Sequence, residues 1–308
     1  MSSEPSEVII IGAGPAGLTA AIYAARMKLR VLVLESSLPG GRAVYAPMVE
    51  NFPGFPEGII GAELADKMVK QAERFGAEIR FSEEVRDIAL GDKTKSLVTR
   101  SGKFQGLSVI VATGTQQKKL LVPGESEYIG RGISYCAVCD GPLFRNKTVA
   151  VVGSDDYAFE DAISLSNFSK RVLLVLHTEE IEADKVVVEK AKQKTNIDIV
   201  KAKVKEIVGN GFVNAVRVVD SKGNEETLNV DGVFILVGSA PMTNIARKAG
   251  VLLDERGCVK VDRRQATNVE GVFAAGDCTC GGMQIITAAG EGATAAVQAY
   301  RHVRNTKN

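Results

Sequence analysis

Two cysteines stand close together near the middle of this 308-residue chain, in the segment Cys136-Ala137-Val138-Cys139-Asp140. Thiols at this spacing can close a small disulfide ring and reopen as a dithiol, which is the chemistry of electron transfer to other disulfides. A structural zinc site would need two further ligands, which Cys278 and Cys280 could in principle supply. The spacing favours a redox-active pair over a metal site.

A glycine-rich turn, Gly12-Ala13-Gly14-Pro15-Ala16-Gly17, lies between a buried strand at 8–11 and a helix that runs to about residue 27. The first glycine makes the tight turn, the second lets a pyrophosphate approach the helix N-terminus, and the third permits close packing of helix on strand. The next strand ends at Glu35, whose carboxylate can bond an adenosine ribose. The pattern predicts a dinucleotide site that includes Gly12, Gly14, Pro15, Ala16, Gly17 and Glu35.

The chain contains an internal repeat. A shift of 141 positions lays residues 11–35 on residues 152–176 without a gap. Each block has a β-branched run, a turn that opens with glycine, a helix, and a second apolar run that begins after an arginine. Two such βαβ openings predict an α/β fold with two Rossmann-like, doubly wound dinucleotide-binding domains.

An aspartate near the far end of the chain, in Gly276-Asp277, follows the apolar run at 272–275. A carboxylate at the end of a buried strand can accept bonds from cofactor hydroxyls, and it can equally cap a surface turn. Together with Ala112-Thr113-Gly114, which ends another apolar strand, this segment resembles the two-dinucleotide flavoprotein disulfide reductases.

With the Cys136-x-x-Cys139-Asp140 motif added, the whole chain is similar to the low-molecular-weight thioredoxin reductases of the bacterial and archaeal type. The motifs that carry the resemblance are the first glycine turn, Gly40-Gly41, Glu50 to Gly54, Ala112 to Gly114, the cysteine motif, Gly276-Asp277 and the segment that begins at Gln284. The resemblance implies a FAD domain formed by residues 1–116 and 245–308, with an inserted, smaller NAD(P)-like domain at 117–244 and a three-layer β/β/α architecture.

The resemblance also implies roles for individual residues. Beyond the first turn, it places FAD contacts at Gly41, Asn51, Ala112, Thr113, Gly114, Gly276, Asp277, Gln284 and Ile285. It makes Cys139 the thiol beside the flavin and Cys136 the thiol that attacks the disulfide of thioredoxin. Asp140 becomes the general acid that protonates the departing thiolate. The resemblance further implies a homodimer with thioredoxin as its partner.

The second glycine turn departs from the family pattern. Gly14 aligns with Asp155 and Pro15 with Asp156, so carboxylates stand where a pyrophosphate should approach. Glu179 and Glu180 stand near the position where recognition of a 2′-phosphate needs arginine or lysine, and Met283 replaces an expected arginine. We therefore expect that NADPH is not the electron donor. Relatives that lack these signatures use a reduced deazaflavin coenzyme or ferredoxin, and we favour the deazaflavin.

Composition excludes several classes of protein. A net charge of +1 provides no field that would attract nucleic acid or a membrane surface, and the uncharged run at 8–25 is interrupted by glycine and proline. Five cysteines are too few for a secreted disulfide framework, so we expect a cytoplasmic protein. Cys258 is interpreted as a small strand residue, and packing is favoured over a second redox pair for Cys278 and Cys280.

Two other functions remain open. A small-molecule dithiol oxidase on the same scaffold would pass electrons from a dithiol to molecular oxygen, and it would also tolerate an altered nicotinamide site. A non-enzymatic flavin redox sensor is the second alternative, which the acid Asp140 beside the thiols disfavours.

Overall fold

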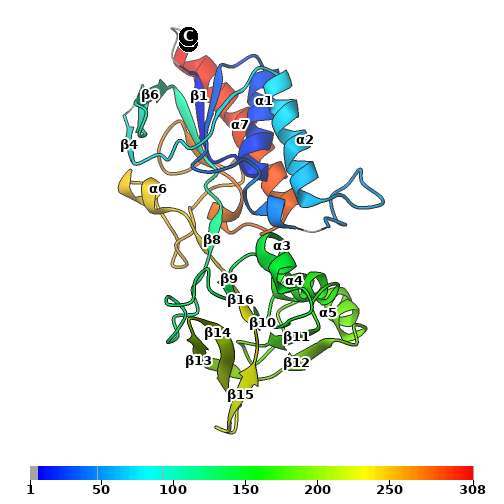
Figure 1. Ribbon diagram of the computed structural model, residues 1–308. Helices are drawn as coiled ribbons and strands as arrows, with labels where there is room; N and C mark the ends of the chain where they lie inside the picture. The colour runs from blue at the N-terminus through cyan, green and yellow to red at the C-terminus, as the bar shows by residue number, and fades with distance from the viewer. Residues whose placement is uncertain (1–5, 47, 92, 308) are drawn as a thin grey trace. The chain divides into compact units, whose positions relative to one another are not determined.

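The computed structural model describes residues 6–46, 48–91 and 93–307. The chain divides into two compact units (Figure 1), of which unit 1 comprises Met1–Gln116 and Ala240–Asn308 and unit 2 comprises Gln117–Ser239. The short strands β8 (Thr115–Gln117) and β17 (Ser239–Pro241) pair where the chain passes from one unit to the other. No helix in the described part of the chain combines the length and the apolar character needed to cross a membrane.

Unit 1 is built on a five-stranded sheet with the order β18-β7-β1-β2-β3, in which all the pairings are parallel. Its strands are β1 (Val8–Ile11), β2 (Val31–Leu34), β3 (Glu78–Arg80), β7 (Ser108–Val111) and β18 (Val272–Ala274). The helices α1 (Pro15–Arg26), α2 (Gly61–Arg74) and α7 (Ile285–Lys307) lie side by side against one face (Figure 1). A second, antiparallel sheet of β4 (Asp87–Leu90), β5 (Lys95–Val98) and β6 (Lys103–Gly106) lies on the other side.

The alternation of side chains along the parallel strands explains these layers. Val8 and Ile10 of β1 belong to the cluster formed with the helices, whereas Ile9 and Ile11 belong to the cluster that includes Leu97 of β5. All four strand residues are almost fully buried. A strand that is covered on both faces needs a continuous apolar run, and the sequence Val-Ile-Ile-Ile meets that need.

Unit 2 repeats the plan. Its parallel sheet has the order β12-β11-β10-β16-β9, with the helices on one face and an antiparallel sheet on the other. The strands of the parallel sheet are β9 (Ile133–Ser134), β10 (Thr148–Gly153), β11 (Arg171–Val175), β12 (Ile197–Val200) and β16 (Gly232–Leu236). The antiparallel sheet consists of β13 (Lys203–Asn210), β14 (Phe212–Val219) and β15 (Glu225–Asn229). The helices are α3 (Ala137–Asp140), α4 (Asp156–Ser166) and α5 (Lys185–Lys192), while α6 (Asn244–Lys248) belongs to unit 1.

The predicted repeat is present in the structure. The first block forms β1-α1-β2 and the second forms β10-α4-β11, and in both the second strand lies parallel to the first. Helix α1 begins at Pro15 and helix α4 at Asp156, so the two helices start 141 positions apart, as the alignment requires. The prediction of an α/β fold with two Rossmann-like units is confirmed.

Candidate functional site

The first glycine turn needs glycine for reasons that the geometry makes explicit. Gly12 has φ +100°, and a Cβ atom there would lie 2.4 Å from the carbonyl oxygen of Ala112. A Cβ atom on Gly17 would lie 1.9 Å from the carbonyl oxygen of Gly12. At Gly14 the protein leaves room, because the nearest atom is the Cα of Gly41 at 3.9 Å. The turn is therefore packed tightly on its inner side and is open at Gly14.

Helix α1 starts directly behind this opening. Gly14 is its N-cap residue, Pro15 occupies the first turn, and neither a capping side chain nor an acidic residue of the first turn blocks the terminus. The first backbone N–H groups of a helix have no intrahelical partner and carry partial positive charge. An uncapped terminus behind a glycine turn is suited to bind an anion such as a pyrophosphate.

Glu35 lies at the end of β2 and is almost fully buried. One of its carboxylate oxygens accepts a hydrogen bond from the backbone N–H of Ala13 (2.7 Å), and the other accepts one from the N–H of Ser37 (2.9 Å). These bonds hold the glycine turn against β2. Contact with a ribose remains a prediction for this residue.

Three further segments lie beside the turn at the carboxyl ends of the parallel strands, where ligands bind in open α/β sheets. A Cβ atom on Gly41 would lie 3.0 Å from the Cα of Gly14, so the backbones of these two glycines are in direct contact. The segment Ala112 to Gly114 follows β7, and the backbone N–H of Ala112 donates to Ile11 (2.8 Å). Ala275, which follows β18, donates to Val111 (2.9 Å).

Gly276 and Asp277 are held against the start of α1. A Cβ atom on Gly276 would lie 2.8 Å from the Cβ of Ala16. Burial raises the pKa of the Asp277 carboxyl, and the nearby Arg42 opposes that shift. In the same unit Asn51 donates from its amide to the side-chain oxygen of Gln284 (3.1 Å), just before α7 begins at Ile285. Unit 1 thus brings together the predicted flavin-binding segments.

Two residues of this neighbourhood were missed by the sequence analysis. Arg42 donates to the hydroxyl of Thr115 (3.0 Å) and lies near Asp277. Glu291 on α7 accepts a hydrogen bond from the backbone N–H of Gly276 (2.7 Å) and one from the hydroxyl of Thr279 (3.1 Å). Burial raises the pKa of Glu291, and Asp277 raises it further. The position of Arg42 directly after Gly40-Gly41 was a usable signal, whereas nothing local marked Glu291.

The cysteine motif lies in unit 2, between β9 and η2 (Gly141–Phe144). Cys136 is disulfide-bonded and half-buried. The hydroxyl of Ser134 accepts from the backbone N–H of Cys136 (3.0 Å) and donates to its carbonyl oxygen (3.2 Å). Asp140 is half-buried, and its backbone N–H donates to the carbonyl of Cys136 (3.2 Å). The side chain of Cys139 lies outside the described part of the structure.

A buried carboxylate supports the segment before Cys136. Glu125 is 2% exposed and accepts hydrogen bonds from the backbone N–H groups of Leu120 (2.9 Å) and Leu121 (2.6 Å). The hydroxyl of Tyr135 donates to the same carboxylate (2.7 Å). Burial and the neighbouring Glu125 hold the pKa of Tyr135 far above its ordinary value. Tyr135 is thereby fixed next to Cys136.

The second glycine turn is closed by acidic side chains. Asp155 is the N-cap of α4, and its carboxylate accepts from the backbone N–H of Ala158 (3.1 Å). Asp156, in the first turn of the helix, accepts from the backbone N–H of Asp184 (2.7 Å). The terminus that is open in α1 is therefore capped in α4 by the chain itself, and two carboxylates lie beside it.

The remaining cysteines correct two interpretations and confirm a third. Cys258 and Cys280 form a disulfide with a Cα–Cα distance of 5.8 Å, so the interpretations of Cys258 as a small strand residue and of Cys280 as a packing residue were wrong. Cys278 is a free, buried thiol, as a packing role requires. Its sulfur contacts the carbonyl oxygens of Val111 and Ala275, and burial raises its pKa to about 11. Among the described residues, no cluster of His, Cys, Asp and Glu side chains could hold a metal ion.

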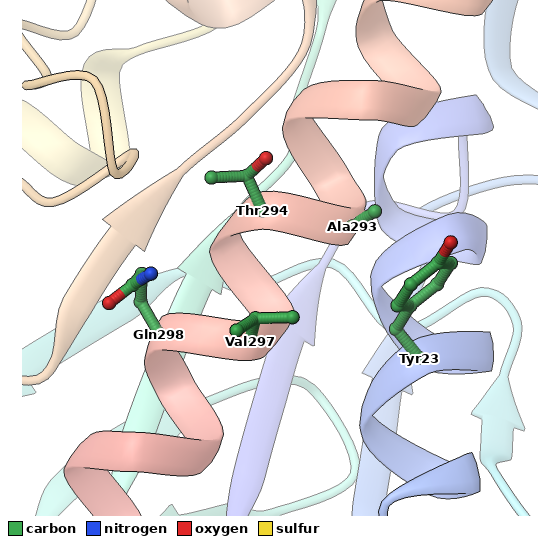
Figure 2. Close-up of a pocket in the computed structure, with 5 residues that line it drawn as sticks. All are labelled: Tyr23, Ala293, Thr294, Val297 and Gln298. Carbon is green, nitrogen blue, oxygen red and sulfur yellow. The ribbon is translucent and has the colours of Figure 1, made fainter.

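A shallow hollow lies between α1 and α7 (Figure 2). It is lined by Tyr23, Ala293, Thr294, Val297 and Gln298. Tyr23 lies eight residues beyond Pro15, which is about 12 Å along the axis of α1. None of the lining residues is among the predicted dinucleotide-binding residues.

Comparison with known proteins identifies the class of the chain. Residues 6–292 match the model of the pyridine nucleotide-disulphide oxidoreductase family. The thioredoxin reductase of Listeria innocua is 39% identical over 313 residues, which cover 100% of this chain and 97% of that protein. Among solved structures, thioredoxin reductase of Lactococcus lactis has a TM-score of 0.94 at 36% identity and covers 97% of this chain and 99% of its own. T. acidophilum thioredoxin reductase has a TM-score of 0.93 at 41% identity, with 96% and 98% covered.

The fold and the site therefore define a flavoprotein disulfide oxidoreductase, for which FAD is the expected cofactor. The chain belongs to the pyridine nucleotide-disulphide oxidoreductase family and, within it, to the low-molecular-weight thioredoxin reductases. A ferredoxin-flavin thioredoxin reductase of Clostridium acetobutylicum is also similar, at 32% identity and a TM-score of 0.53, with 98% and 99% covered.

Proposed function

We propose that this chain is a FAD-dependent reductase in which the Cys136/Cys139 dithiol reduces the disulfide of a thioredoxin, with an electron donor other than NADPH. The observation that carries the choice of donor is the difference between two helix N-termini. Helix α1 has an open terminus behind Gly14, whereas α4 is capped by Asp155. A reduced deazaflavin coenzyme is the donor that we favour, and ferredoxin is the second candidate.

The residues of unit 1 fit FAD. The turn from Gly12 to Gly17 and the open terminus of α1 would hold the pyrophosphate, and Glu35 would hold the adenosine ribose. Asp277, whose raised pKa reflects the cost of burying its charge, would accept hydrogen bonds from ribityl hydroxyls. When bound, FAD supplies the two electrons that return the cysteine pair to its dithiol form.

The proposed exchange uses the chain's own residues. The Cys136 thiolate attacks one sulfur of the thioredoxin disulfide, a mixed disulfide forms, and the other thioredoxin sulfur leaves as a thiolate. The Cys139 thiolate then attacks the sulfur of Cys136, which releases reduced thioredoxin and leaves the Cys136–Cys139 disulfide. Asp140 is the proton source for the departing thiolate.

Several features oppose NADPH as donor. Binding of a pyrophosphate at α4 would require the Asp155 carboxylate to leave the N–H of Ala158 and would place the phosphates beside Asp156. Glu179 and Glu180 are exposed after β11, where a 2′-phosphate needs a base. From residue 153 to residue 184 the chain has eight acidic and two basic residues.

Ferredoxin as donor would require a basic docking surface, because ferredoxins are acidic. Five basic residues of unit 2 near the cysteine motif in the sequence are all exposed: Lys118, Lys119, Arg131, Arg145 and Lys147. The similarity to the ferredoxin-flavin thioredoxin reductase supports this second candidate.

Anaerobic bleaching of the flavin absorbance tests the choice of donor. Purified holoenzyme is mixed in parallel with NADPH, NADH, reduced deazaflavin and reduced ferredoxin. We expect fast bleaching with the deazaflavin and none with NADPH at the same concentration. Fast bleaching by NADPH would overturn the proposal. Oxygen consumption with a small dithiol, in the absence of any other donor, would instead support a dithiol oxidase.

A variant tests the role of the capped helix directly. Asp155→Gly combined with Glu179→Arg opens the terminus of α4 and supplies a base for the 2′-phosphate. We expect it to bind NADPH more tightly than the wild type in a calorimetric titration. Glu189→Arg, which makes the same charge change as Glu179→Arg at an exposed position of α5, is the control for charge and should leave NADPH binding unchanged.

Trapping tests the roles of the two thiols. Cys139→Ser leaves Cys136 without the thiol that resolves the mixed disulfide, so a covalent adduct with oxidised thioredoxin should accumulate and be visible by mass spectrometry. Cys136→Ser is the matched control and should give no adduct. An adduct in the control alone would reverse the assignment. The homodimer implied by the family is a separate proposal, which light scattering of the purified enzyme tests.

A further inference from the structure

Unit 1 contains a second disulfide, which the proposed reaction does not use. It joins Cys258 to Cys280, 22 positions apart, and the segment between them contains β18, Gly276 and Asp277. Both ends lie in unit 1, whereas the cysteine motif lies in unit 2. The disulfide therefore closes a loop of chain around the proposed flavin-binding aspartate.

The end at Cys258 is firmly anchored. Asp254 accepts hydrogen bonds from the backbone N–H groups of Arg256 (2.9 Å) and Cys258 (2.9 Å), so it fixes a tight turn. The next residue, Val259, donates its backbone N–H to the carbonyl oxygen of Cys278 (2.9 Å). Cys258 is 1% exposed. This end forms part of the rigid core.

The end at Cys280 belongs to a segment with unfavourable backbone conformations. Cys280 and Met283 both have left-handed φ angles, of 58° and 53°, which are unfavourable for residues other than glycine. Gly281 and Gly282 stand between them and add conformational freedom to the unfolded loop. A loop of this kind keeps a defined shape only if its surroundings hold it.

Few other bonds hold the residues that follow Cys278. Glu291 accepts from Gly276 and Thr279, and the backbone N–H groups of Thr279 and Cys280 donate to Gly276 (2.8 Å) and Asp277 (3.1 Å). These two backbone bonds of Thr279 and Cys280 are local to the turn, whereas Cys278 before them is joined to Val259 and Ala275 to Val111. The link from Cys280 to the anchored Cys258 is covalent, and it fixes the residue three positions after Asp277.

Burial decides between a fixed crosslink and a second redox couple. Cys258 is buried and Cys280 is only half-buried, so an external thiolate reaches the sulfur of Cys280 first. The leaving group would then be a buried Cys258 thiolate, which the apolar surroundings disfavour. Exchange slows when the leaving thiolate is unstable. The neighbouring thiol of Cys278, whose pKa burial raises to about 11, shows how strongly this region disfavours a thiolate.

We propose that the Cys258–Cys280 disulfide is a permanent covalent staple that positions the Asp277 loop for FAD and takes no part in electron transfer. The proposal rests on FAD binding in unit 1, as set out under the proposed function. It does not depend on which electron donor or which disulfide substrate the enzyme uses.

Release of FAD tests the positioning role. Cys258→Ser/Cys280→Ser removes the staple, and the dissociation of FAD is followed by the rise of flavin fluorescence after dilution. We expect release at least about tenfold faster than from the wild type, because loss of one hydrogen bond from FAD to a charged carboxylate is worth about that factor or more. Release at the wild-type rate from a folded double variant would overturn the proposal. Circular dichroism and a urea transition show whether that variant is folded.

Alkylation of the wild type tests the second half of the proposal without a variant. The folded holoenzyme is reduced anaerobically with excess dithiothreitol, treated with iodoacetamide, and mapped by peptide mass. We expect Cys258 and Cys280 to remain bonded while Cys136 is modified. Modification of all three would make the second disulfide a redox couple and overturn the proposal. Failure of Cys136 alone to react would contradict the proposed function and leave the staple intact.

Discussion

Substitution of Gly17 by alanine offers the sharpest test of the flavin site. The new Cβ atom would lie 1.9 Å from the carbonyl oxygen of Gly12 and 3.3 Å from the side chain of Ile10. The turn cannot retreat, because Gly12 packs directly against the carbonyl of Ala112 on its other side. The clash must therefore be relieved by movement of α1 away from β1.

The structure sets the size of this effect. Ordinary contact begins at 3.4 Å, so the Cβ atom is 1.5 Å too close to the Gly12 oxygen. Overpacking of this kind costs about 1–3 kcal/mol. We expect Gly17→Ala to lower the free energy of unfolding of the FAD-free protein by that amount. If the displaced helix terminus also weakens the binding free energy of FAD by about 1–3 kcal/mol, the affinity for FAD falls by a factor of about 5 to 150.

Gly14→Ala provides the matched comparison. No protein atom other than the Cα of Gly41, at 3.9 Å, lies near a Cβ atom at this position, and its φ of −74° suits alanine. We expect the stability of the FAD-free protein to change by at most about 1 kcal/mol, the scale of an N-cap substitution. FAD affinity should nevertheless fall, because the methyl group points to where the pyrophosphate would approach.

Two measurements separate these outcomes. Urea unfolding of the FAD-free proteins gives the change in stability, and fluorescence titration with FAD gives the change in affinity. Wild-type stability of Gly17→Ala would refute the role of the clash. Wild-type FAD affinity of Gly14→Ala would refute the proposed path of the pyrophosphate over the turn.

Three further predictions concern other parts of the chain. Burial and the neighbouring Glu125 raise the pKa of Tyr135, so its neutral hydroxyl contributes fully to stability below pH 10 and loses that contribution as the pH rises towards the folded pKa. Tyr135→Phe should therefore lower the urea midpoint at pH 8. The difference from the wild type should shrink at alkaline pH. Burial raises the pKa of Glu7, but hydrogen bonds and charges from Lys307 and Arg30 lower it by more. The Glu7 carboxylate therefore contributes to stability above pH 4.5, and this contribution is lost as the pH falls further. Glu7→Gln should be less stable than the wild type at pH 7 and equally stable at strongly acidic pH. The buried thiol of Cys278 should resist iodoacetamide at pH 8 and react only in urea, as peptide mapping would show.

The fold could be predicted from the sequence because the pattern of strand, turn and helix is local and occurs twice. The runs Val8–Ile11 and Thr148–Gly153 are buried on both faces, and each is followed by a turn and a helix at the same spacing. Such segments form a βαβ unit whatever surrounds them. The positions around Gly12 were predictable for the same reason, since a turn that must pack on itself leaves a glycine pattern in the sequence.

The parts of the site that were missed depend on contacts between distant segments. Glu291 meets Gly276 only because α7 packs on α1, where a Cβ atom on Gly292 would touch Ala16. Cys258 meets Cys280 because the backbone N–H of Val259 donates to Cys278, which lies in the short 3-10 helix η3 (Asp277–Thr279). A cysteine spacing of 22 residues carries no signal of its own, so the sequence indicated a small strand residue for Cys258 and a packing residue for Cys280. The correction came from tertiary structure alone.

The two helix N-termini explain how one fold can keep one cofactor site and alter the other. The sequence already indicated that Asp155 and Asp156 stand where glycine and proline stand in the first turn. The structure adds that Asp155 satisfies the N–H of Ala158, so the carboxylate supplies internally what a pyrophosphate would supply in α1. An N-cap of this kind stabilises a helix by about 1 kcal/mol. Asp155→Gly should therefore open the terminus of α4 and also lower the stability of unit 2. This variant binds NADPH only if the free energy of its phosphate interactions exceeds the stability lost with the N-cap. Glu179→Arg is therefore added, because it supplies a further interaction with the 2′-phosphate.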